Sequence, residues 1–161
     1  MARFGRFTLS EISLNRLLFA VKVRLGELPP LAAWKFSSLA RENQARLEQY
    51  QDKHLGGRCF IVANGPSLNK TNLDFLSEEI TFGLNRIYLN FQKSLFRPTY
   101  YAAVNELILE QFTAEVSNLS MPKFLNWNRR SYFDFRDPDI NFIKSKMVVN
   151  DFFQPDITKP L

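Results

Sequence analysis

Residues 60–76 read FIVANGPSLNKTNLDFL, and this stretch contains the transition that decides the fold. The run RCFIVA (58–63) is short and continuously apolar, as expected for a strand that is buried on both faces of a parallel sheet. The residues NGPS end this strand, and a short helix is expected around 72–78. A strand that ends in a glycine-containing turn at the start of a helix is a common way to hold a phosphate group.

Short strands and helical segments alternate from residue 58 onward. Further strands are expected at ITFGLN (80–85), YYAAVN (100–105), PKFLNW (122–127), INFI (140–143) and KMVVN (146–150). The segment ELILEQFTAEVS (106–117) is expected to be one helix, with Leu107, Ile108, Phe112 and Val116 on one side. This alternation predicts an α/β domain of Rossmann-like type with a mainly parallel sheet.

The N-terminal part of the chain has a different pattern. Residues 10–25 predict a helix, with an apolar face formed by Leu14, Leu17, Leu18, Val21 and Leu25. The turn GELPP (26–30) is expected to end this helix, and a second helix is expected from there to about Lys53. The glycines of HLGG (54–57) suit the end of that second helix. We therefore expect a helical region at 1–56 and a Rossmann-like domain at 57–161.

Composition and charge exclude several classes of protein. Hydrophobic residues make up 45% of the 161 residues, and sixteen are phenylalanine, so an intrinsically disordered chain is excluded. Residues 1–60 contain ten Lys or Arg against five Asp or Glu, whereas residues 61–161 contain eleven of each. The basic excess thus belongs to the helical region, which argues against a nucleic-acid-binding core.

The sequence favours a cytoplasmic protein. The longest apolar run, LLFAVKVRLG (17–26), is interrupted by Lys22 and Arg24 and is too short to span a bilayer. The single cysteine, Cys59, excludes an internal disulfide framework and is expected to be a small core residue of its strand. The helix at 10–25 combines basic residues with an apolar stripe. Two interpretations stay open for it: peripheral contact with the inner face of a membrane, and packing against another part or copy of the chain.

Three of the expected strands end in the same type of residue, namely Asn64, Asn85 and Asn105. In open α/β sheets ligands bind beyond the carboxyl ends of the strands. A side-chain amide both donates and accepts hydrogen bonds, so it can recognise ribose hydroxyls, base edges or phosphate oxygens without adding charge. These residues are therefore candidate ligands for a nucleotide.

The turn after the first strand adds Gly65, Pro66 and Ser67 to the candidate site. Glycine lets a ligand approach the backbone closely, and proline suits the first position of a helix because its missing N–H has no partner there. Ser67 and neighbouring N–H groups would then face an anion. The same residues also make an ordinary turn, and the sequence contains neither the GxGxxG fingerprint nor a Walker loop.

The segments GRCFIVANGPSLNKTNLDFL, ITFGLNRIYLNF and FRPTYYAAVNELILEQF resemble the first half of the MptE-like domain family. This family includes archaeal 6-hydroxymethylpterin diphosphokinases and bacterial proteins linked to surface-polysaccharide synthesis. The same segments are similar to bacterial sialyltransferases that use CMP-sialic acid. The resemblance covers roughly residues 56–157, and the three segments occur in the family's order.

The resemblance implies roles for single residues. Asn64, Gly65 and Ser67 match the loop that contacts the nucleotide, and Asn85 matches an asparagine that faces the nucleotide in the sialyltransferases. Asn105 falls where relatives carry an acidic or amide residue. Ala63 replaces the glycine that usually opens the first motif. Relatives continue with a Gly-Gly-Thr-Val segment and a strand ending in Gly-x-Asp, so the resemblance implies that this chain is a truncated member of the family.

Other side chains allow competing interpretations. The single histidine, His54, is expected to cap the end of the second helix, where a cation is favourable, or to lie on the surface, rather than to act in catalysis. Asp137-Pro138-Asp139 has the Asp-x-Asp pattern of metal-dependent glycosyltransferases, but proline and aspartate also form simple turns, and no metal site is expected. Arg129 and Arg130 lie among aromatic residues, as in a surface loop that could meet an acidic substrate. No residue is assigned as the catalytic base.

The sequence thus predicts a nucleotide-binding transferase domain, similar to a glycosyltransferase and supplied with a CMP-sugar or another nucleotide sugar. One alternative is a pterin pyrophosphokinase that uses Mg-ATP. A third interpretation is a non-catalytic module that binds a nucleotide or serves as a scaffold. The expected partners are a nucleotide or nucleotide sugar and no nucleic acid.

Overall fold

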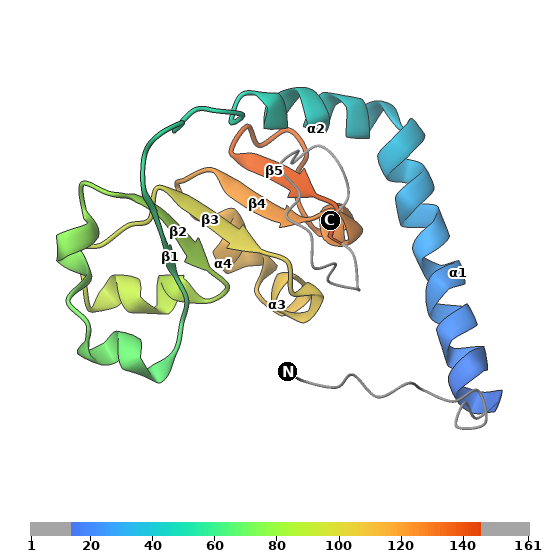
Figure 1. Cartoon of the computed structure of the whole chain (residues 1–161), viewed down its shortest axis with the longest axis horizontal. Helices are drawn as coiled ribbons and strands as arrows, with labels where there is room; N and C mark the ends of the chain where they lie inside the picture. The colour runs from blue at the N-terminus through green and yellow to red at the C-terminus, as the bar shows by residue number, and fades with distance from the viewer. Residues whose placement is uncertain (1–13, 146–161) are drawn as a thin grey trace, which may run out of the picture.

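The computed structural model describes residues 14–145 and has an open, five-stranded sheet at its centre (Figure 1). All neighbouring strands are parallel, and their spatial order is their order in the chain. The strands are β1 (Cys59–Val62), β2 (Ile80–Leu84), β3 (Tyr100–Ala103), β4 (Lys123–Asn126) and β5 (Ile140–Ile143). The α/β, Rossmann-like fold and five of the expected strands are confirmed; the expected strand at 146–150 lies outside the described residues.

The segments that connect the strands pack against one face of the sheet. They contain the helices α3 (Glu106–Gln111) and α4 (Thr113–Ser117) and the 3-10 helices η2 (Pro66–Lys70), η3 (Leu73–Leu76), η4 (Ile87–Gln92) and η5 (Trp127–Tyr132). Right-handed crossovers between strands in sequential order place all connections on the same face. On this face Gly83 of β2 lies so close to its neighbours that a Cβ atom would meet both Ile87 and Pro98 at 2.8 Å.

The opposite face of the sheet carries a group of aromatic side chains. Phe82, Tyr100 and Phe124 come from three adjacent strands, and Tyr50 packs edge-on against two of them with centroid distances of 5.8 and 5.0 Å. Next to these rings lies an apolar hollow of about 490 Å³. Within residues 14–145 this face is thus covered only in part, because the side chain of Ile61 remains exposed.

The two edges of the sheet differ in how they are protected. At β5 the amide of Asn43 accepts a hydrogen bond from the N–H of Phe142 and donates one to its carbonyl, both at 2.7 Å. Asn43 is completely buried and occupies the hydrogen-bonding groups that a further strand would use. Asn43 belongs to the helix α2 (Ser38–Glu48), and Arg46, one turn further along it, donates to the carbonyl of Asp137 at 3.2 Å.

At the other edge, the expectation that the first strand is buried on both faces is wrong. Cys59, Phe60 and Ile61 are exposed, and Val62 is the one buried residue of β1. A continuous apolar run does not distinguish a central strand from an edge strand, because the neighbours that decide burial come from elsewhere in the chain. The expectation that Cys59 is a core residue is wrong for the same reason.

The N-terminal helices also differ from the expectation. The first helix does not end at GELPP: α1 (Leu14–Phe36) runs through Pro29 and Pro30, and α2 (Ser38–Glu48) follows after a break at Ser37. Ser37 has an extended backbone conformation, and its side chain accepts a hydrogen bond from the N–H of Ala40 at 3.1 Å, as an N-cap does. Residues 10–13 of the expected first helix lie outside the described residues.

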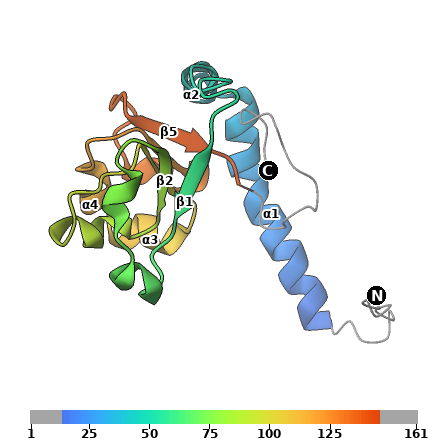
Figure 2. The ribbon, with the colours of Figure 1, turned by 60° about the vertical axis from the view of Figure 1, so that its left-hand side comes forward.

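Packing of tryptophans holds α1 to the sheet domain beyond its two prolines. Trp34 contacts Trp127 of η5 edge-on, with a centroid distance of 5.2 Å, and both are buried. The indole N–H of Trp127 donates to the carbonyl of Pro30 at 3.1 Å. Proline inside a helix removes a backbone hydrogen bond, so this tertiary contact offsets a local loss. From there the N-terminal part of α1 extends away from the sheet in both views (Figures 1 and 2).

The expected helix at 106–117 is interrupted. The backbone of Phe112 leaves helical geometry (φ −125°, ψ 33°), which separates α3 from α4. Leu109 and Val116 face the core, whereas Leu107, which was expected on the buried side, is 63% exposed. The break rotates α4 relative to α3 about the helix axis. The apolar residues of the two helices therefore do not form one continuous stripe.

Candidate functional site

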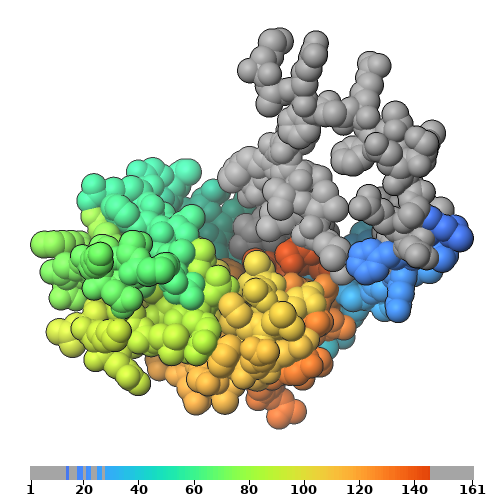
Figure 3. Space-filling model, turned by 90° about the horizontal axis from the view of Figure 1, so that it is seen from below, coloured from blue at the N-terminus to red at the C-terminus, as the bar shows by residue number. Residues whose placement is uncertain are grey.

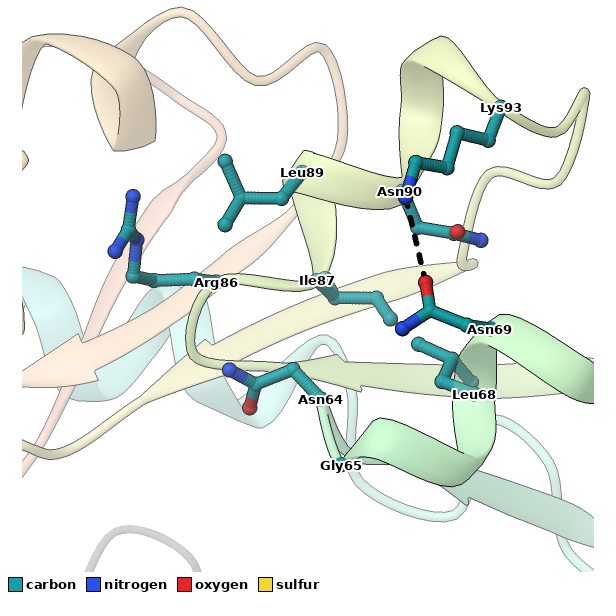
Figure 4. A pocket seen from close by; sticks show the side chains of 9 residues that line it. All are labelled: Asn64, Gly65, Leu68, Asn69, Arg86, Ile87, Leu89, Asn90 and Lys93. Atoms are coloured by element: carbon teal, nitrogen blue, oxygen red, sulfur yellow. Dashed lines mark hydrogen bonds between the residues drawn. The ribbon is translucent and has the colours of Figure 1, made fainter.

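A hollow of about 230 Å³ lies between the segments that follow β1 and β2. Its lining residues are Asn64, Gly65, Leu68, Asn69, Arg86, Ile87, Leu89, Asn90 and Lys93. Asn64 and Arg86 lie towards one end of the hollow, and Asn69, Asn90 and Lys93 lie at the other (Figure 4). The two segments are side by side on the face of the molecule that Figure 3 shows. The site is thus at the carboxyl ends of two adjacent parallel strands, where ligands bind in this class of fold.

Local sequence fixes the shape of the first segment. Pro66 occupies the first position of η2, where a missing N–H costs nothing, and this expectation is confirmed. The helix that follows has five residues and 3-10 geometry. Gly65 has an extended backbone (φ −82°), and a Cβ atom there would meet only the Ser67 hydroxyl, at 3.7 Å. Glycine is therefore not required by the backbone at this position; its effect is to leave the mouth of the hollow open.

The second segment turns sharply at Asn85. Its φ of 51° lies in the left-handed region, which asparagine adopts more readily than most residues other than glycine. The N–H of Asn85 still donates to the carbonyl of Ala102, at 3.1 Å, as part of the sheet. The turn therefore begins directly at the end of β2 and brings Arg86 into the hollow.

The hollow is electropositive. Arg86 and Lys93 line it, and none of its nine lining residues is acidic. The guanidinium of Arg86 lies over the ring of Phe112, with its carbon 4.0 Å from the ring centroid. This contact orients the guanidinium without neutralising its charge. The Nε atom of Arg86 is buried and has no hydrogen-bond partner among the described residues.

Tyr88 lies next to Arg86, and Tyr101 packs against Tyr88. Tyr88 and Tyr101 have ring centroids 6.5 Å apart, and both hydroxyls are buried without a hydrogen-bond partner among residues 14–145. Burial raises the pKa of both hydroxyls, so they stay protonated at neutral pH and remain able to donate. Arg86 lies next to the Tyr88 hydroxyl and lowers its pKa, in opposition to the larger effect of burial.

Amide groups form the rest of the polar lining. Lys93 donates to the side-chain oxygen of Asn69 at 3.4 Å, which links the two segments across the hollow (Figure 4). A second hollow, of about 330 Å³, shares Leu68, Asn69, Asn90 and Lys93 with the first. It is extended by a largely polar group of residues: Thr71, Asn72, Leu73, Asp74 and Ser94. The two hollows therefore adjoin, one cationic and the other rich in hydroxyl, amide and carboxylate groups.

The structure brings together some of the residues that the sequence singled out. Asn64 and Gly65 line the hollow, whereas Pro66, Ser67, Asn85 and Asn105 are not among its lining residues. Asn105 is the N-cap of α3: its side-chain oxygen accepts hydrogen bonds from the N–H groups of Leu107 (3.0 Å) and Ile108 (3.5 Å). This accounts for an asparagine at that strand end without a ligand.

Replacing Asn105 with alanine should therefore reduce stability and leave ligand binding unchanged. Loss of the cap is expected to cost about 1 kcal/mol of unfolding free energy, whereas Asn105→Asp should retain most of it. Chemical denaturation of the two variants would measure the difference. An Asn105→Ala chain that is as stable as the parent but binds its ligand less tightly would show that Asn105 belongs to the site.

The arginines after β4 are paired within the fold. Arg129 forms ion pairs with Glu106 (2.6 Å) and with Glu110. The guanidinium of Arg130 lies over Trp127, 4.4 Å from the ring centroid. Arg129 therefore meets acidic groups of its own chain.

The remaining candidates have local partners too. Asp137 accepts a hydrogen bond from the N–H of Asp139 at 2.9 Å and lies 3.5 Å from the ammonium of buried Lys123, so the Asp-x-Asp segment forms a turn. His54 is exposed, which confirms one of the two expectations for it, but it lies beyond the end of α2, which stops at Glu48, and so does not cap that helix. Its Nε2 atom is 2.7 Å from the hydroxyl of Tyr100, beside the apolar hollow on the open face.

The residues that give the site its charge do not stand at the strand ends. Arg86, Asn90 and Lys93 follow β2 at a spacing of four and three residues, a polar stripe that periodicity analysis could have detected. The strand-end pattern selects Asn85, the residue directly before Arg86.

No protein-family model matches this chain, and searches of curated proteins and of solved structures give no significant match. The resemblance to the MptE-like family therefore stays a prediction.

Proposed function

We propose that the hollow between the segments after β1 and β2 binds the phosphate groups of a nucleotide donor, and that the chain is the donor-binding part of a glycosyltransferase-like enzyme. The observation that carries this proposal is that two cations, Arg86 and Lys93, line one amide-rich hollow at the carboxyl ends of two parallel strands. The resemblance described above independently favours the same loop.

Charge argues for phosphate as the bound group. A guanidinium presents several N–H donors in a planar fork, which fits phosphate oxygens, and Lys93 adds a mobile point charge. The ring of Phe112 holds the Arg86 guanidinium in place, so little conformational freedom is lost on binding.

The neighbouring polar hollow supports a sugar-containing donor. Asp74, Ser94 and Asn72 supply carboxylate, hydroxyl and amide groups of the kind that hydrogen-bond to hydroxyl-rich ligands, in addition to the bonds by which Asn72 caps η3 and Ser94 contacts Asp74. Asn69 and Lys93 belong to both hollows, so one ligand with a phosphate next to a sugar fits the arrangement. Catalysis would then depend on positioning the donor and on neutralising the charge that develops on its phosphate.

A panel of nucleotides tests the proposal and separates it from its alternatives. Thermal unfolding would be followed with CMP, CDP, UDP, GDP and Mg-ATP, and a ligand well above its dissociation constant should raise the midpoint by several degrees. Stabilisation by a cytidine or another sugar-donor nucleotide supports the transferase. Stabilisation by Mg-ATP alone would favour the pyrophosphokinase, and no response from a folded chain would leave a scaffold.

Gly65→Val provides the matching test of location. A side chain at this position has room in the fold but narrows the mouth of the hollow, so the midpoint without ligand should hardly change and the response to nucleotide should be lost. Gly26→Val is the control for the added side chain, because Gly26 lies in α1 with open space around it. A nucleotide response that survives Gly65→Val would contradict the assigned site.

A further inference from the structure

The N-terminal part of α1 exposes an apolar stripe that no described part of the chain covers. Leu14, Leu18, Val21, Leu25 and Leu28 recur at spacings of four and three residues and therefore share one side of the helix. Between 45% and 70% of each of these side chains is exposed. In both views this part of the helix extends beyond the sheet domain (Figures 1 and 2). So much exposed apolar surface on one element is a mark of an interaction site.

The charge of the same region identifies the kind of surface that fits it. Residues 1–36 contain six Lys or Arg against two Asp or Glu, so this segment carries four of the chain's five net positive charges. Lys22 is exposed and falls beside the stripe by helical spacing, and Arg16 and Arg24 belong to the same helix. Lysine and arginine beside an apolar stripe place their charged ends at headgroup level while the stripe enters the acyl boundary.

We propose that α1, from Leu14 to Leu28, binds the surface of a bilayer that contains anionic lipids. No helix among residues 14–145 is long and apolar enough to cross a membrane, so the helix would lie along the surface. A second copy of the helix fits less well: the stripe covers two heptads where stable coiled coils use more, and two such basic helices would repel each other. This binding is independent of the nucleotide site.

Vesicle flotation with the full chain tests the proposal. We expect the chain to float with vesicles of phosphatidylcholine containing about one third phosphatidylglycerol and not with phosphatidylcholine alone, and added salt should weaken the binding. The double variant Leu18→Asp/Leu25→Asp should reduce binding on the order of tenfold or more. The matched control is Leu55→Asp/Leu95→Asp, because both leucines are at least 84% exposed and lie outside α1. The control should float like the parent.

A charge reversal separates the contribution of the basic residues to membrane binding from that of the apolar stripe. Lys22→Glu should weaken binding to the anionic vesicles several-fold, whereas Lys70→Glu, an exposed lysine of η2, should not. Equal binding to neutral vesicles, or equal losses in the two lysine variants, would contradict the proposal. So would a chain that ignores vesicles but forms dimers by light scattering that Leu18→Asp/Leu25→Asp abolishes, because the partner of the stripe would then be a second copy.

Discussion

Replacing Trp127 with alanine is expected to lower the unfolding free energy by about 3–5 kcal/mol, the range for truncating a buried tryptophan. Trp127 is completely buried, packs edge-on against Trp34 and Phe142, and donates its indole hydrogen to the Pro30 carbonyl. It therefore connects α1, η5 and β5. The variant leaves a cavity between these elements and removes the hydrogen bond to the Pro30 carbonyl, and urea denaturation would measure the loss.

Two variants make this prediction specific. Trp127→Phe keeps a ring in the cavity but removes the indole N–H, so it should cost less, about 1–3 kcal/mol. Tyr132→Ala removes a large ring from the same 3-10 helix, but Tyr132 is 48% exposed, so a loss of about 1 kcal/mol or less is expected. If Trp127→Ala cost no more than Tyr132→Ala, Trp127 would not be the contact that joins the helical region to the sheet.

Replacing Arg86 with alanine is expected to weaken nucleotide binding by a factor on the order of 10 to 100, which corresponds to the loss of charged hydrogen bonds worth about 1.5–3 kcal/mol. Arg86 is the residue whose guanidinium is oriented by Phe112 and whose Nε atom lacks a partner among the described residues. Arg86→Lys should recover part of the affinity, since it restores the charge but not the planar fork. Isothermal titration calorimetry with the nucleotide that stabilises the parent would measure both variants.

Arg97→Ala is the matched control. Its guanidinium lies 4.3 Å from the ring centroid of Phe91, close to the 4.0 Å between Arg86 and Phe112, so both variants lose one charge and one contact with an aromatic ring. Arg97→Ala also removes hydrogen bonds to backbone carbonyls of its own loop, so its stability is measured alongside. Arg97 does not line the hollow and should leave affinity unchanged. Equal losses of affinity in the two variants would show that general charge, rather than the position of Arg86, governs binding.

The strands could be predicted because each is a short apolar run bounded by turn residues. INFI at 140–143 was located to the residue, and RCFIVA, ITFGLN and YYAAVN each contain the observed strand. Their burial could not be predicted. β5 is protected by Asn43, almost a hundred residues earlier, while β1 has no such cover among residues 14–145. Burial on a sheet depends on long-range partners, and a local pattern contains no information about them.

The predicted helix boundaries are wrong where tertiary contacts override the local preference of the sequence. Two consecutive prolines favour a break at 29–30, yet α1 continues to Phe36 because Trp34 and the Pro30 carbonyl are held by Trp127. The break occurs instead at Ser37, whose side chain caps α2. Serine is a good N-cap, and this one takes that position directly after the turn that Trp34 packs in place.

The strand ends predicted the location of the candidate site but not its charge. Asn64 and Gly65 were found from the rule that ligands bind at the carboxyl ends of strands, and the structure places them in the lining of a hollow. The same rule selected Asn105, whose amide caps α3. Arg86 and Lys93 enter the hollow because the left-handed turn at Asn85 redirects the chain, a backbone feature that the sequence does not display.

The most direct test of the nucleotide site is a titration of the ¹⁵N-labelled chain with the nucleotide that stabilises it best, followed by NMR. We expect the largest amide shifts in the segments 64–69 and 86–93, the two sides of the hollow. Largest shifts elsewhere, for example around His54 and Tyr100 beside the apolar hollow on the open face, would contradict it.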